Sequence, residues 1–95
     1  MQFANRGTED VYNQVPSKAA RAVCPAAIIN VARRKLYQLA TVESLDELRV
    51  PPGNHLEALR GNRLGQHFVR INDQYRVCFR WTDGEPEDVE IVDYH

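Results

Sequence analysis

The sequence predicts an α+β fold, because helix-type and strand-type patterns occupy different halves of the chain. Apolar residues recur with the period of an amphipathic helix between residues 25 and 39, whereas short runs rich in β-branched and aromatic residues follow one another from residue 55 to residue 94. Only brief turn signals separate these runs, so the sheet should be largely antiparallel. The preceding helices are expected to cover one face of it.

With 95 residues, 43% of them hydrophobic and 26% charged, the chain has the size of a single domain spanning residues 1–95. Its two cysteines, Cys24 and Cys78, have no metal-type spacing, which argues against a disulfide scaffold or a zinc module and fits a reducing cytoplasm. No apolar run approaches the roughly 18 residues of a membrane span, and the N-terminal segment does not resemble a signal peptide. We therefore expect a cytoplasmic protein without a membrane partner.

Two helices are expected in the first half. Thr8-Glu9-Asp10 has the pattern of a helix start, with a capping hydroxyl before acidic first-turn residues, and predicts a brief helix that ends near Pro16. A linker of small residues follows, and Pro25 suits the first position of a longer helix. The apolar face of this longer helix consists of Ile28, Ala32, Leu36 and Leu39. Its opposite face, which meets solvent or a partner, carries Asn30, Arg33, Arg34 and Gln38.

The second half should be mainly strands. Ser44 and Glu47 form a capping-box pattern for a short helical turn, which the loop-forming residues 51–54 then end. Asn72-Asp73 and Asp83-Gly84 are the expected hairpin turns. The strands themselves are expected near residues 55–60, 66–72, 75–82 and 88–94.

An arginine-rich face is predicted on this sheet. Residues 49–80 hold six arginines against two acidic residues, a net charge of +4, although the whole chain has a net charge of -1. Side chains alternate along a strand, so Arg76, Cys78 and Arg80 share one face, and Arg70 of the preceding strand joins them. Such a group can bind phosphate. The alternative interpretation is that these arginines only solubilise an open sheet face.

Acid–base candidates occur at two places. His95 titrates near neutrality and lies two residues from Asp93, whose carboxylate can orient it, although a terminal segment of this kind is often frayed and without a role. Glu57 is the only acidic residue among the arginines apart from the turn residue Asp73, and it can act as a base or hold an arginine. On an ideal strand Glu57 and Arg60 point to opposite faces. Both can serve one site only if the strand bulges or ends before residue 61.

The three histidines and Asp93 are of the residue types that bind metal ions. No pair among them has the close, fixed spacing of a known ligand motif. We therefore expect neither a metal nor a cofactor. The histidines are His55, His67 and His95.

Three stretches together resemble a known family: residues 51–63 (PPGNHLEALRGNR), residues 70–79 (RINDQYRVCF) and residues 93–95 (DYH). They resemble the HigB-type toxins of the RelE superfamily, and the similarity covers nearly the whole chain, because residues 3–10 and 34–36 also look like the helical half of that family. The resemblance implies a compact RelE-like microbial RNase fold. In that fold an N-terminal strand and two helices pack on one face of a mainly antiparallel sheet.

The resemblance also implies an mRNA interferase, a ribosome-dependent endoribonuclease that enters the small-subunit decoding site. Such enzymes cleave mRNA through attack of the ribose 2′-hydroxyl on the adjacent phosphate, without a metal. A helix-turn-helix antitoxin of the HigA type would sequester the toxin, and contact with DNA would be indirect, through that complex.

Site residues carry over position by position. His95 and Asp93 look like acid–base residues, Tyr94 like a stacking or orienting group and Arg76 like the phosphate stabiliser, while Arg60 stands where related toxins often have lysine. Further contacts to RNA are expected from Arg63, Arg70, Arg80 and His55.

Glu57 is the clearest departure, because other HigB toxins have histidine at this position. Three hypotheses remain open: Glu57 is the base, His55 replaces the missing histidine from the same strand face, or His95 does most of the proton transfer. Two rival functions also remain. One is a non-catalytic, ParE-like toxin that binds gyrase, and the other is an inactive relative that only binds its antitoxin.

Overall fold

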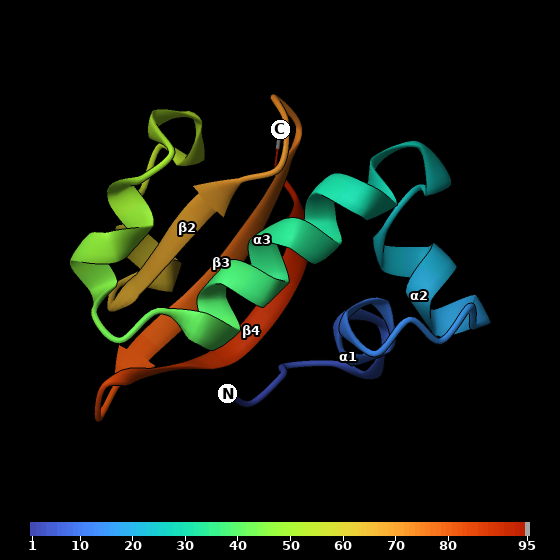
Figure 1. Ribbon diagram of the computed structural model, residues 1–95, viewed down its shortest axis with the longest axis horizontal. Coiled ribbons are helices and arrows are strands. Elements are labelled where there is room, and N and C mark those ends of the chain that lie inside the picture. The colour runs from blue at the N-terminus through green and yellow to red at the C-terminus, as the bar shows by residue number, and fades with distance from the viewer. Residues whose placement is uncertain (95) are drawn as a thin grey trace.

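The computed structural model describes residues 1–94, in which a helical layer packs on one face of a four-stranded antiparallel sheet (Figure 1). The strands follow one another across the sheet in chain order. The α+β class is therefore confirmed. The strands are β1 (Glu57–Ala58), β2 (Gln66–Arg70), β3 (Tyr75–Thr82) and β4 (Glu85–Asp93).

The helical layer contains α1 (Arg6–Tyr12), α2 (Lys18–Val23) and α3 (Ile29–Thr41). In Figure 1, α3 lies over β3 and β4, and α1 and α2 lie to its right. None of the helices within residues 1–94 is long and apolar enough to cross a membrane.

Two details predicted for the first half are wrong. The cap of α1 is Asn5, whose side-chain oxygen accepts a hydrogen bond from the backbone N–H of Thr8 at 2.8 Å, so Thr8 lies inside the helix and is buried. The predicted linker of small residues contains α2, which Ser17 caps through a bond from the N–H of Ala20 at 3.0 Å. Alanine is the strongest helix former, so a small-residue composition combined with a serine cap favours a helix over a linker.

The long helix has the predicted apolar face: Ala32, Leu36 and Leu39 are fully buried. A short 3₁₀ turn, Ala26–Ile28, comes first, so Pro25 precedes that turn and α3 itself begins at Ile29. The opposite face is only partly exposed, because Arg33 is half-buried and its Nε donates to the carbonyl oxygen of Val11 at 3.1 Å. The helices are thus joined to one another as well as to the sheet.

The sheet face toward the helices is apolar, and its buried residues alternate as predicted. Asp83 and Gly84 form the expected hairpin turn, with φ angles of 54° and 81° that suit a two-residue connection. β1 is much shorter than predicted, since it has only two residues, and β4 begins three residues earlier. The core residues on this face are Val69, Ile71, Val77, Phe79, Val89 and Ile91.

The outer edge of β4 is sealed by the N-terminal segment and α1. The expected N-terminal strand is reduced to one parallel bridge, in which Ala4 donates to Val89 at 2.9 Å and Val89 donates to Gln2 at 3.0 Å. Further along the edge, the N–H of Ile91 donates to the hydroxyl of the buried Thr8 at 3.0 Å. The outward-facing backbone groups of Val89 and the N–H of Ile91 therefore have partners within the chain.

A buried polar network fastens the loop before β1 to α3. Asn54 is fully buried, and its side-chain amide donates to Gln38 at 2.9 Å and to the carbonyl of Leu48 at 3.0 Å. Lys35 donates to the side-chain oxygen of the same asparagine at 2.5 Å. The predicted capping box is confirmed at the start of this loop, where Glu47 closes the turn. These contacts fix the position of the loop that leads into β1.

Gly7 lies where α1 and α2 pack closely, and Gly7→Ala is expected to destabilise the fold. An added Cβ would lie 2.5 Å from the carbonyl oxygen of Ala19 and 2.9 Å from both methyl groups of Val23. We expect the free energy of unfolding, measured by urea denaturation, to fall by about 1–3 kcal/mol. Gly53→Ala is the control, because its Cβ would meet nothing within 4 Å. Equal stability of both variants would contradict the close helix contact.

Candidate functional site

The sheet face away from the helices carries the predicted arginine face. In the register of β2 and β3, Arg70 lies opposite Arg76 and Phe68 lies opposite Cys78, as the alternation predicted. Cys78 is buried, and burial raises the pKa of its thiol to about 11. The thiol is therefore protonated at neutral pH and is not a nucleophile for this face.

A pocket of about 440 Å³ opens on this face and brings together four predicted site residues from three separate segments. They are Glu57, Arg60, Arg76 and Tyr94. The pocket is completed by Ala58, Leu59 and Phe68. Phe68 was not predicted as a site residue, although the alternation that places it on the arginine face was already available in the sequence.

Glu57 and Arg60 reach the same pocket because β1 is short. Glu57 pairs with Phe68 and therefore lies on the open face. The strand ends at Ala58, and the chain then turns at Gly61, which has a φ of 61°. This is the arrangement that a shared site requires, since a regular strand would separate the two side chains.

Arg76 lies against two neighbouring aromatic rings. Its guanidinium carbon lies 5.2 Å from the ring centre of Phe68 and 6.0 Å from that of Tyr94. Its Nη1 donates to the carbonyl oxygen of Tyr75 at 3.2 Å and also to that of Asn72. Its Nε is buried and has no acceptor among the residues that the structure describes. The cation is thus fixed by stacking and by backbone carbonyls.

The other arginines of this face are neutralised by carboxylates. Arg63 pairs with Glu90 at 2.8 Å, a hydrogen bond that raises the pKa of the arginine. Arg70 pairs with Asp73, and the Nε of Arg80 lies 3.5 Å from Asp88. Within residues 1–94, neither Arg60 nor Arg76 forms an ion pair.

The uncompensated positive charge of this face is therefore concentrated in the pocket. Arg70 and Arg80 share the face with Arg76, as predicted, but they do not line the pocket, and neither does Arg63. Their expected contacts to RNA stay predictions.

Two other candidate acid–base residues, Asp93 and His55, do not line the pocket. Asp93 accepts a hydrogen bond from the side chain of Gln74 at 3.0 Å and lies opposite Tyr75, on the other side of the strand from Tyr94. His55 is exposed, has a φ of 46° and precedes β1, so the prediction that it shares a strand face with Glu57 is wrong. His95 lies outside the described residues, and its role stays a prediction.

His67 lies on the helix side of the sheet, where its ring stacks on Phe79 at 6.1 Å. Burial lowers the pKa of this imidazole, with a further contribution from the positive charge of Arg49. Residues 1–94 contain no group of three or more His, Cys, Asp or Glu side chains that could hold a metal ion.

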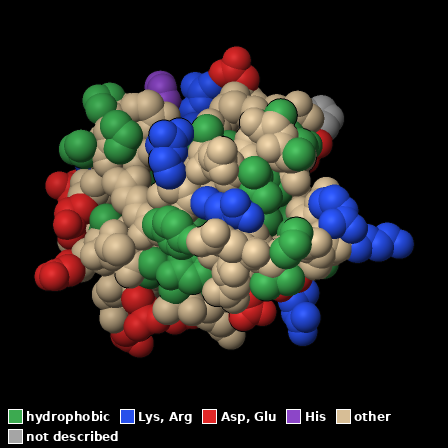
Figure 2. All heavy atoms as spheres, turned by 45° about the vertical axis from the view of Figure 1, so that its right-hand side comes forward, with side chains coloured by type: hydrophobic (Ala, Val, Ile, Leu, Met, Phe, Trp, Pro, Cys, Tyr) green, Lys and Arg blue, Asp and Glu red, His purple; other side chains and the backbone are tan. Residues whose placement is uncertain are grey.

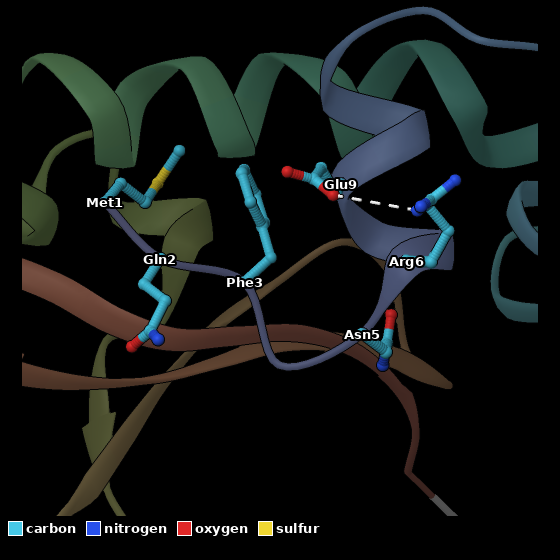
Figure 3. A pocket seen from close by; sticks show the side chains of 6 residues that line it. All are labelled: Met1, Gln2, Phe3, Asn5, Arg6 and Glu9. Atoms are coloured by element: carbon cyan, nitrogen blue, oxygen red, sulfur yellow. Dashed lines mark ion pairs between the residues drawn. The ribbon is translucent and has the colours of Figure 1, made fainter.

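A second hollow, of about 410 Å³, lies between the N-terminal segment and α1. Figure 3 shows Met1 and Phe3 pointing toward α3, with the Arg6–Glu9 ion pair at 3.9 Å to one side. The space-filling view of this side of the molecule shows lysine and arginine side chains interspersed with apolar patches (Figure 2). None of the predicted catalytic residues lines this hollow, so the pocket on the open face is the candidate site.

A helical layer on one face of a small four-stranded antiparallel sheet is the architecture of a RelE-like α+β fold. A solved structure described as a YoeB/ParE toxin from Agrobacterium tumefaciens is similar over 99% of this chain and 97% of its own, with a TM-score of 0.50 and 16% identity, which bears on the fold alone. The family model described as the RelE-like toxin of the type II toxin–antitoxin system HigB matches residues 1–95. The chain belongs to this HigB-like toxin family.

Curated relatives agree with the family. Toxin HigB-1 of Vibrio cholerae is 38% identical over 84 residues, which cover 88% of this chain and 85% of that protein. An uncharacterized protein of Haemophilus influenzae is 34% identical over 67 residues, which cover 70% of this chain and 66% of that protein. The protein is thus a toxin of a type II toxin–antitoxin system, and its partner is an antitoxin.

Proposed function

We propose that this toxin is a ribosome-dependent mRNA endoribonuclease that acts in the cytoplasm as one domain, residues 1–95. The observation that carries the proposal is the pocket that Arg60, Arg76 and Glu57 line together, in which neither arginine forms an ion pair within residues 1–94. Two positive charges can stabilise a phosphoryl group and one carboxylate can accept a proton, and these are two of the tasks in cleavage of a phosphodiester bond.

In the proposed reaction the ribose 2′-hydroxyl attacks the adjacent phosphorus atom while the bond to the 5′-oxygen of the next nucleotide breaks. One proton leaves the 2′-oxygen and one reaches the departing 5′-oxygen, which yields a 2′,3′-cyclic phosphate and a 5′-hydroxyl. Negative charge grows on the phosphoryl oxygens between these steps. A planar guanidinium that is fixed in advance can stabilise that charge without having to reorganise.

The residues receive distinct roles. Arg76 stabilises the phosphoryl oxygens, because the rings of Phe68 and Tyr94 and two backbone carbonyls already fix its position. Arg60, which lines the same pocket, adds a second positive charge, and Glu57 accepts the proton of the 2′-hydroxyl. The sequence pattern supports His95 as the group that protonates the leaving oxygen. Asp93 does not line the pocket, so it acts by orienting the terminal segment.

The ribosome is proposed to supply what the pocket lacks. Within the described residues the pocket offers few groups that could orient a flexible single strand, because the remaining arginines of the face are engaged with carboxylates. An mRNA held in the decoding site is already ordered, which removes much of the entropic cost of alignment. Inhibition is assigned to a helix-turn-helix antitoxin of the HigA type, which would also provide the contact with DNA.

Primer extension on mRNA-programmed ribosomes tests this function. Purified toxin should produce cuts within the codon in the decoding site, and it should cut the same RNA poorly when ribosomes are omitted. A gyrase supercoiling assay, run in parallel, tests the ParE-like alternative. Intact mRNA on ribosomes together with inhibited gyrase would overturn the proposal, and no effect in either assay would support an inactive, antitoxin-binding relative.

Glu57→Gln is expected to lower the single-turnover rate of cleavage on ribosomes by about 10²-fold, because the amide keeps the shape of the side chain but cannot accept the 2′-hydroxyl proton. The matched control is Glu43→Gln, since Glu43 is exposed and does not line the pocket. An unchanged rate in Glu57→Gln would remove Glu57 from the chemistry and leave the proton transfer to His95.

A further inference from the structure

The turn between β2 and β3 lies against the chain end that carries the candidate acid–base residues. Asn72 fixes the turn from within, because its side-chain oxygen accepts hydrogen bonds from the N–H groups of Gln74 at 2.9 Å and Tyr75 at 2.7 Å. The N–H of Ile71 donates to the carbonyl of Tyr75 at 3.0 Å and closes its base. The turn is thus a defined structure rather than a loose connection.

Gln74 contacts the end of the chain through both its backbone and its side chain. The ladder between β3 and β4 ends at the pair Tyr75–Asp93. Beyond it, the N–H of Tyr94 donates to the carbonyl oxygen of Gln74 at 2.6 Å, and the side-chain amide of Gln74 donates to a carboxylate oxygen of Asp93 at 3.0 Å. One residue therefore holds two successive residues of the terminal segment.

The same turn also holds Arg76, the proposed phosphate stabiliser. Arg76 donates to the carbonyl of Asn72, and its guanidinium lies against the ring of Tyr94. The centre of the Tyr94 ring is 5.8 Å from that of the Phe68 ring, which also lines the pocket. The positions of the cation and of the terminal segment are thus both set by residues 72–74, although these residues do not line the pocket themselves.

We propose that Gln74 is a positioning residue for the cleavage reaction, an inference that rests on the proposed function. A small misplacement of a reacting group costs rate steeply. Gln74 limits such misplacement because its two hydrogen bonds fix Asp93 and Tyr94 relative to Arg76. It touches neither the substrate nor the reacting atoms, and it acts through the residues that it holds.

The test replaces the side-chain amide and leaves the backbone contact in place. Gln74→Met has nearly the same length but donates no hydrogen bond, and Gln74→Glu brings a second carboxylate toward Asp93. We expect kcat for cleavage on programmed ribosomes to fall by about tenfold in Gln74→Met and further in Gln74→Glu, with KM unchanged. Gln2→Met is the control, since Gln2 is exposed and contacts β4 at Val89, away from the turn that holds Gln74.

A spectroscopic measurement separates this inference from the proposed function. In the wild-type toxin, NMR should show cross-relaxation between the ring protons of Tyr94 and Phe68, and the signal should weaken in both Gln74 variants while the thermal midpoint stays near that of Gln2→Met. An unchanged ring signal would overturn the positioning role even if no toxin variant cleaves RNA. A weakened signal in a toxin that never cleaves would support the positioning of the segment but overturn the nuclease function. Unchanged kcat in an active toxin would also overturn the positioning role.

Discussion

Arg76→Ala is expected to lower the single-turnover rate of codon cleavage by about 10²–10³-fold, the loss that follows removal of one fixed donor to a developing negative charge. The alanine variant leaves Arg60 as the only cation that lines the pocket within the described residues. It also leaves the rings of Phe68 and Tyr94 without the guanidinium that lies against them. Rapid mixing of excess toxin with programmed ribosomes, followed by primer extension, measures the rate of the chemical step.

Two companion variants make the result interpretable. Arg76→Lys keeps the charge but loses the planar fork, so its rate should fall between those of the wild type and the alanine variant. Arg49→Ala removes an exposed arginine that pairs with Asp46 outside the pocket, and its rate should stay at the wild-type level. If Arg76→Ala cleaves as fast as Arg49→Ala, the pocket is not where the phosphate binds.

His95→Gln carries the second large expected effect, a decrease of about 10²–10⁴-fold in the rate of cleavage, because it removes the proposed donor of a proton to the leaving oxygen. The substitution keeps the chain length, so it separates the loss of the imidazole from the loss of the residue. His95 is next in sequence to Tyr94, whose ring lines the pocket.

The pH dependence identifies the role of His95. A general acid works in its protonated form, so the wild-type rate should decline as the pH rises past the titration of the imidazole, and His95→Gln should lack that decline. A variant with the wild-type rate and the wild-type pH profile would show that the terminal histidine is dispensable. Deletion of His95 should give the same result as His95→Gln, unless the main chain of this residue is also needed.

Position 57 carries glutamate where the resemblance to other HigB toxins implies histidine, and this glutamate lines the pocket together with Arg60 and Arg76. A carboxylate there can accept a proton, but it also offsets part of the positive charge that is proposed to bind RNA. Position 57 can thus provide a base whether the residue is a histidine or a glutamate. His55, the other candidate for this task, has a left-handed backbone and precedes β1, so it does not share a strand face with Glu57.

The fold was largely predictable because most of its signals are local. The period of α3, the capping box at Ser44 and Glu47 and the turn at Asp83-Gly84 depend on neighbouring residues, and all three are confirmed. The start of α1 was wrong because Asn5 competes with Thr8 for the same capping role, and only the packing of Thr8 against the sheet decides between them.

The candidate site was predictable in its residues but not in its assembly. Alternation along β3 correctly placed Arg76 on the open face. The meeting of Glu57 with Arg60 depends on where β1 ends, which follows from the path of the loops on either side. The pairing of Arg63 with Glu90 joins residues 27 positions apart, so no local pattern reveals which arginines stay uncompensated. The tertiary structure therefore decides which arginines lack an ion pair.

The covered edge of β4 matters when the toxin has dissociated from its antitoxin. A toxin acts only while no antitoxin is bound to it. In that state an unpaired sheet edge could pair with a second copy of the chain and begin to aggregate. In β4, the longest strand, the backbone groups that bond to Gln2, Ala4 and Thr8 are not available for such pairing. The opposite edge is β1, whose two residues are too few to sustain pairing. After release from the antitoxin, the two edges of the sheet therefore offer little unpaired backbone to a second copy of the chain.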